Sequence, residues 1–194
     1  MEFCKLKEFK NQLKDNIIIG ATGHIDIEKA LNINPKKEDL SEYDENLLDN
    51  MYKKLDELLN GLKNITFISG MARGWDEIIA LFAIKNNYNL ILAIPNSVKW
   101  HKNRIYKKRV QAIFYDRILE YKKAKIYEIN KIYNDKFYYY SYFARNQFIV
   151  DNSDIILTFY GYKSGGTLDC IKRAKKLNKC IFNFYEIIRR KDEK

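Results

Sequence analysis

Three glycine-bearing segments carry the residues of this sequence that are best suited to hold a negatively charged molecule. They are GATGH (20–24), SGMARGWDE (69–77) and YGYKSGGTLD (160–169), and each follows a short apolar run. Glycine lets a ligand approach the backbone closely, and the N–H groups at the start of a helix attract anions. We therefore predict that these segments together form a phosphate-binding crevice.

The middle segment places Arg73 between Gly70 and Gly74, immediately before a helical pattern. The glycines permit a turn, and the guanidinium group of Arg73 can pair with a phosphate or a carboxylate through two hydrogen bonds. Asp76 or Glu77 would then lie near the start of a helix, where the helix dipole favours a carboxylate.

The elements that must position these segments follow from the apolar pattern of the chain. Short apolar runs predict strands that are buried from both sides, at 16–20, 65–69, 90–95, 124–129, 154–160 and 180–185. Helical patterns lie between them, at 39–60, 75–86, 103–122, 136–150 and 167–177.

This alternation predicts an α/β fold, with a mostly parallel sheet of about six strands and helices on both faces. We assign residues 16–185 to a single Rossmann-like domain, 1–15 to an N-terminal helical extension and 186–194 to a tail. In such sheets a ligand binds beyond the carboxyl ends of the strands, where the strand order reverses.

Composition narrows the class of protein. The chain has 194 residues and a net charge of +10, and residues 99–125 hold ten Lys and Arg against two acidic residues, a local net charge of +8. No run reaches the roughly 18 apolar residues of a membrane helix. Three cysteines and two histidines without metal-ligand spacing argue against a metal site. We expect a cytoplasmic protein with free thiols that needs no metal and no cofactor and meets no membrane.

Taken together, TGH (22–24), SGMARGWDEIIALFAI (69–84), IPNSVKWHKNRIYKKR (94–109) and RNQFIVDNSD (145–154) resemble the SLOG superfamily. That superfamily includes the DNA-processing protein A, the LOG-type nucleotide phosphoribohydrolases and the YpsA-like proteins. The resemblance covers roughly residues 16–185. It implies a Rossmann-like domain that binds nucleotides or nucleotide-derived molecules, and in some members cleaves N-glycosidic bonds.

The residues that we predict to contact the ligand come from the loops and from these motifs. They are Gly20, Thr22, Gly23, His24, Gly70, Arg73, Gly74, Asp76, Trp100, Arg145, Asn146, Ser164, Gly165, Gly166 and Thr167. Candidates for a catalytic carboxylate are Asp76, Glu77 and Asp169. The LOG enzymes carry an essential glutamate three residues after the threonine of their glycine loop, and Cys170 stands at that position here.

Three functions are compatible with these residues. We rank first the binding of a nucleotide or an NAD- or ADP-ribose-like ligand, by a receptor or sequestering protein that we expect to be a homo-oligomer. An N-glycosidic bond hydrolase is the second, and whether the protein is an enzyme stays open because the catalytic glutamate is missing. A single-stranded DNA binder that uses the basic stretch 99–125 is the third. It ranks last because the DNA-processing proteins usually carry flanking domains.

Overall fold

A computed structural model describes residues 3–32, 43–106, 112–129, 138–162 and 165–189. The strands are β1 (Ile18–Gly23), β2 (Thr66–Ser69), β3 (Asn89–Pro95), β4 (Ala124–Ile129), β5 (Ile155–Phe159) and β6 (Ile181–Asn183). The helices are α1 (Leu6–Gln12), α2 (Ile27–Ala30), α3 (Glu45–Leu59), α4 (Trp75–Lys85), α5 (Val98–Tyr106), α6 (Ala112–Leu119), α7 (Tyr138–Asp151), α8 (Gly165–Lys176) and α9 (Tyr185–Arg189).

The strands form one parallel sheet in the order β4-β3-β2-β1-β5-β6. β1 is central: Ile19 lies opposite Phe67 of β2 and opposite Ile155 of β5. The chain runs outward from β1 to β4, returns to β5 on the other side of β1, and continues to β6. The strand order therefore reverses between β1 and β5, which confirms the predicted α/β fold.

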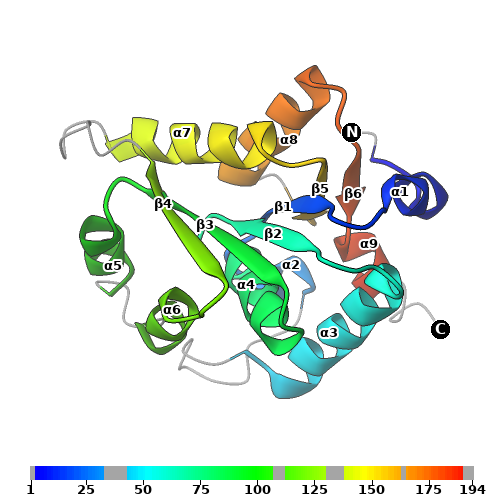
Figure 1. Cartoon of the computed structure of the whole chain (residues 1–194), viewed down its shortest axis with the longest axis horizontal. Helices are drawn as coiled ribbons and strands as arrows, with labels where there is room; N and C mark the ends of the chain where they lie inside the picture. Colours follow the sequence, from blue (N-terminus) through cyan, green and yellow to red (C-terminus); the bar gives the residue numbers. More distant parts are fainter. Residues whose placement is uncertain (1–2, 33–42, 107–111, 130–137, 163–164, 190–194) are drawn as a thin grey trace.

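Helices cover both faces of the sheet (Figure 1). α3, α4 and α6 lie on one face over the larger core, to which Ile19, Phe67 and Leu92 contribute. α7 and α8 lie on the other face over smaller clusters, in which Ile149 packs with Ile68 and Ala93. Successive residues of β1 to β3 and of β5 thus alternate between two apolar faces, as strands of a covered parallel sheet must.

β4 departs from its prediction as a strand buried from both sides. Lys125, Ile126 and Tyr127 are all exposed, because β4 pairs with β3 and forms an edge of the sheet among the described strands. A lysine on an edge strand also disfavours unwanted pairing with other strands.

Two predicted helices and the start of the predicted tail also differ in the structure. α3 begins at Glu45, where the Asp44 side chain accepts a hydrogen bond from the N–H of Leu47, and residues 39–42 of the predicted helix lie outside the described residues. In place of a helix over 103–122, α5 begins at Val98 and α6 covers Ala112–Leu119. Residues 185–189 of the region assigned largely to a tail form α9, in which Ile188 is buried.

No helix in the described ranges is long and apolar enough to cross a membrane.

Candidate functional site: the carboxyl edge of the sheet

The predicted glycine-bearing segments meet at the carboxyl edge of the sheet. The hydroxyl of Thr167 donates to the carbonyl of Gly23 over 2.9 Å, and so ties the start of α8 to the end of β1. The N–H of Trp75 donates to the carbonyl of His24 over 3.0 Å, and so ties the start of α4 to the same place. We call this edge, with the loops after β1, β2, β3 and β5 and the start of α8, the rim.

His24 holds the loop after β5 in place. Its Nε2 accepts hydrogen bonds from the N–H groups of Gly161 (2.9 Å) and Tyr162 (3.0 Å), and its ring stacks on that of Tyr162 with centroids 3.8 Å apart. Burial lowers the pKa of His24 to about 4. A neutral imidazole that accepts at Nε2 carries its proton on Nδ1. His24 therefore lies at the predicted crevice but occupies two of the backbone donors that an anion would otherwise use.

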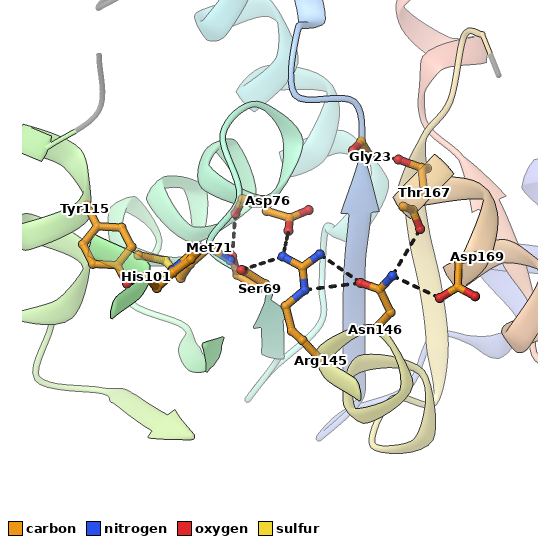
Figure 2. Close-up of polar contacts among 12 residues, drawn as sticks. Gly23, Ser69, Met71, Asp76, His101, Tyr115, Arg145, Asn146, Thr167 and Asp169 are labelled. Atoms are coloured by element: carbon orange, nitrogen blue, oxygen red, sulfur yellow. Dashed lines mark hydrogen bonds and ion pairs between the residues drawn. The ribbon is translucent and has the colours of Figure 1, made fainter. Parts of the chain in front are cut away.

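Arg145 crosses the rim from α7 and is engaged by the protein itself (Figure 2). Its Nη1 donates to the carbonyl of Gly70 over 2.9 Å and lies 3.9 Å from a carboxylate oxygen of Asp76. Its Nε and Nη2 donate to Oδ1 of Asn146 over 3.2 and 2.9 Å. Only 10% of the Arg145 side chain is exposed, so this buried cation is compensated by internal partners.

Asn146 extends the same network to α8. Its Nδ2 donates to Oδ2 of Asp169 over 3.1 Å and to the carbonyl of Gly166 over 3.4 Å. Asp169 also accepts from Nε of Arg173, one turn later on α8, over 3.0 Å. We call Asp76, Arg145, Asn146, Asp169 and Arg173 the rim network; it holds two cations and two carboxylates and links three helices.

The candidate catalytic carboxylates are separated. Asp76 belongs to the rim network, whereas Glu77 accepts from the hydroxyl of Tyr43 over 2.6 Å. Burial raises the pKa of Asp76 to about 6 and that of Glu77 to about 7. Asp76 and Asp169 are connected through Arg145 and Asn146, and Glu77 lies on the side of α3.

Tyr43 was not found by sequence reasoning. Its hydroxyl accepts from the N–H of Gly74 over 2.9 Å while donating to Glu77, so it fixes the first turn of α4. It lies just before α3, far from the glycine segments in sequence, and no motif marks it. Burial raises the pKa of both Tyr43 and Glu77, and the charge of the half-buried Arg73 offsets part of this rise, which places Arg73 on this side of the rim.

The predicted glycines divide into two groups. A Cβ on Gly70 would lie 2.8 Å from Nη1 of Arg145, and a Cβ on Gly74 would lie 2.2 Å from the carbonyl oxygen of His24. Gly20 and Gly23 are equally confined, by Ser153 and Trp75. A Cβ on Gly165 or Gly166 would meet nothing within 4 Å.

The remaining predicted residues are accounted for as follows. Thr22 is buried beside Cys170 of α8. Trp100 packs against Tyr142 of α7 with ring centroids 6.1 Å apart, and Arg104 lies over its ring. Ser164 lies outside the described residues.

His101, the neighbour of Trp100, is buried beside Tyr115. Its Nδ1 lies 3.0 Å from the Tyr115 hydroxyl. Burial, reinforced by the charges of Arg145 and Arg104, lowers the pKa of His101 to about 3, so this histidine is neutral. It supports α5 and α6 and does not face the loops after β1 and β5.

A cavity of about 360 Å³ lies at the opposite, amino edge of the sheet. It is lined by Lys63, Asn64, Ile65, Asn86, Asn87, Tyr88, Asn89 and Lys123. Within the described ranges, no three histidine, cysteine or carboxylate side chains are grouped to hold a metal ion.

The strand order and the gathering of loops at the carboxyl edge define a doubly wound, Rossmann-like domain. Residues 39–194 match the model of the family described as DNA recombination-mediator protein A. The chain belongs to that family, and so to the SLOG group that its motifs resemble.

Two solved structures show the same fold. DNA processing protein A from Streptococcus pneumoniae is 16% identical, with a TM-score of 0.55 over 90% of this chain and 51% of that one. A structure of DNA processing protein A from Helicobacter pylori, described for its single-stranded DNA binding mode, is 17% identical, with a TM-score of 0.52 over 90% of this chain and 66% of that one. This chain thus spans about half of the first protein and about two thirds of the second. No curated protein matches it.

Proposed function

We propose that this protein binds single-stranded DNA across the rim, with a phosphate at the start of α8 and a base on Tyr162. The family match supports a role in DNA processing, and the structure from Helicobacter pylori belongs to a protein described as binding single-stranded DNA. Single-stranded DNA binding, which ranked third among the functions predicted from the sequence, is therefore the function that we now place first.

The observation that carries the proposal is the open start of α8. The first turn of a helix has backbone N–H groups without partners inside the helix, and these attract phosphate. Gly165 and Gly166 are exposed, and in the part of the chain that the structure describes no atom of another segment lies within 4 Å of the position of a Cβ on either one. Among the described residues, no side chain therefore stands where a phosphate group would approach this backbone.

Tyr162 provides a stacking surface next to this helix start. Tyr162 is 37% exposed, and its ring is held parallel to that of His24 with an interplanar angle of 5°. The Lys29 ammonium lies 5.9 Å from the ring centroid. A rigid aromatic ring beside a cation suits a nucleobase and its phosphate, because stacking tolerates any base sequence and cations neutralise the backbone.

The carboxylates at the rim are paired with other side chains of the protein, and this favours a binding function over a hydrolase. Asp76 and Asp169 are joined to Arg145, Asn146 and Arg173, and Glu77 is joined to Tyr43. A general acid or base must reach the scissile bond, and each of these groups is already held by a partner in the protein.

Fluorescence anisotropy with a labelled oligothymidylate tests the proposal. We expect saturable binding that weakens steeply as sodium chloride rises from 50 to 200 mM, and weaker binding of a duplex of equal length. Tyr162→Ala should reduce the affinity about tenfold, since one stacked base contributes roughly 1–3 kcal/mol.

Tyr127→Ala is the matched control, because Tyr127 is exposed to 44% on the edge strand β4, away from β1 and β5. Equal affinity of the wild type and Tyr162→Ala would contradict the proposed site. Tight binding of free mononucleotides with no binding of the oligonucleotide would replace the DNA function by that of a small-nucleotide receptor.

A further inference from the structure

The N-terminal segment of the chain adds to the outer edge of the sheet at β6. The N–H of Cys4 donates to the carbonyl of Ile181 over 2.8 Å. Phe9 of α1 stacks on Phe182 with ring centroids 4.6 Å apart, and Phe3 packs on Tyr160 at 6.2 Å. These contacts hold the first described residues against the last strand in the chain.

This arrangement brings two thiols together. Cys4 and Cys180 are both half-buried, and Cys180 immediately precedes Ile181, whose carbonyl accepts from the N–H of Cys4, so the two thiols lie next to each other. The third cysteine differs, because Cys170 is buried between α8 and the sheet, beside Thr22. Thus only the first two are placed to react with each other and to be reached from solvent.

We propose that Cys4 and Cys180 are an oxidisable dithiol, which a low-molecular-weight disulfide such as oxidised glutathione converts into an intramolecular disulfide. The backbone bond between Cys4 and Ile181, the residue that follows Cys180, holds the two cysteines side by side, which a disulfide requires. The predicted free thiols then describe the reduced state of this pair.

The reaction proceeds in two exchanges. The Cys4 sulfur, as thiolate, attacks one sulfur of oxidised glutathione, and one molecule of glutathione leaves. The Cys180 thiol loses its proton to solvent and attacks the Cys4 sulfur, and the second glutathione leaves. Two protein thiols are oxidised and one glutathione disulfide is reduced. Burial and the neighbouring Cys4 thiol raise the pKa of Cys180 well above its usual value, so Cys4 is the first to react.

The bridge would join positions near the two ends of the sequence, and closing so long a loop strongly constrains the unfolded chain. For a protein of this size we expect the melting temperature to rise by about 10 °C on oxidation. Dithiothreitol should reverse the rise.

Peptide mapping of the full chain after equilibration with oxidised glutathione tests this inference. Trypsin without reduction should release residues 1–5 linked to residues 180–189, and titration should show two of the three thiols lost. Cys180→Ser and Cys4→Ser should abolish both the linked peptide and the thermal shift. Cys170→Ser should keep both, and it is the matched control.

Three results would overturn the inference. One is stable glutathione adducts on Cys4 without the linked peptide. The second is a disulfide between two chains, seen as a dimer on a non-reducing gel. The third is a linked peptide that forms only after denaturation. The double variant Cys4→Ser/Cys180→Ser should melt at the temperature of the reduced wild type, which shows that the fold itself is unaffected.

Discussion

Two glycine pairs at the same rim serve opposite purposes. Gly70 and Gly74, after β2, make room for the protein's own groups: the guanidinium group of Arg145 and the carbonyl of His24 fill the space that a Cβ would need. Gly165 and Gly166, at the start of α8, face open space. A glycine-rich loop is therefore not in itself a binding loop, and only the second pair leaves backbone that a ligand can reach.

The first pair belongs to a closed, internally satisfied structure. Arg145 takes the position beside Gly70 that the sequence suggested for a ligand, and its charge is balanced by Asp76. The second pair lies where α8 begins, beside the exposed ring of Tyr162. The comparison predicts that substitutions around the first pair change stability, whereas substitutions around the second change binding.

The largest effect should come from Arg145→Ala. It removes the charge that faces the buried Asp76 and leaves the Gly70 carbonyl without its donor, so we expect a loss of about 3–5 kcal/mol in the free energy of unfolding. Guanidinium chloride denaturation measures it. If Arg145 acts through Asp76, Asp76→Asn combined with Arg145→Ala should cost clearly less than the sum of the two single changes. Strict additivity would show that the two residues act independently.

Gly74→Ala should cost about 2–4 kcal/mol. Gly74 has a φ of +78° and a Cβ there would meet the His24 backbone, so both strain and overlap contribute. Gly61→Ala is the matched control, because Gly61 has a similar φ of +86° with nothing within 4 Å of the new Cβ. We expect about 1–2 kcal/mol there. Equal losses in thermal melts would mean that the close approach to His24 is not what requires glycine.

The buried ionisable groups predict opposing pH dependences. His24 and His101 have lowered pKa values, so their stabilising contribution is complete above about pH 6.5 and is lost as the pH falls. Asp76 and Glu77 have raised pKa values, so their contribution is complete below about pH 4 and is lost as the pH rises through 6 to 7. Between pH 4.5 and 6.5 the rise in stability due to the histidines and the fall due to the carboxyl groups largely cancel.

Glu77→Gln removes the pH-dependent contribution of Glu77 to stability, while the side-chain oxygen of the new glutamine can still accept a hydrogen bond from Tyr43. Stability of the variant should therefore rise with pH from 4.5 to 6.5, more steeply than that of the wild type by about 1 kcal/mol per pH unit. Urea denaturation at a series of pH values gives the two slopes. Parallel curves would show that Glu77 titrates as in the unfolded chain.

The smallest change in stability should come from Gly166→Ala. The new methyl group meets nothing and the residue is helical, so stability should rise by about 0.4–1 kcal/mol. Under the proposed function the same methyl group hinders a phosphate at the start of α8, so oligonucleotide affinity should fall although the protein is more stable. A gain in stability with unchanged oligonucleotide affinity would show that the phosphate does not bind at the start of α8.

The fold could be predicted because the apolar runs of a covered parallel sheet are short and repeated. A single apolar run does not, however, show whether its strand lies at the centre or at the edge of the sheet. The run at 124–129 contains Lys125 and Glu128, and these charges were the signal that β4 is an edge. The start of α5 could also have been predicted from the sequence, because Ser97 is a typical helix-capping residue. In the structure its hydroxyl accepts from the N–H of Trp100.

The site was harder to predict because its contacts join residues far apart in sequence. Sequence reasoning placed Gly23, His24 and Thr167 at one edge, and the structure joins them there. It did not foresee that His24 would hold the β5 loop or that Tyr43, 31 residues before Gly74, would fix the start of α4. Tyr162 did carry a signal, as an aromatic residue inside a glycine segment.

The central place of β1 also constrains how the chain folds during synthesis. β1 is synthesised before the other five strands but gains its second neighbour only when β5, more than 130 residues later, has been made. Cys4 must wait still longer, for Ile181. The half of the sheet from β1 to β4 can assemble while the rest is still being made, with one side of β1 exposed to the surrounding solvent.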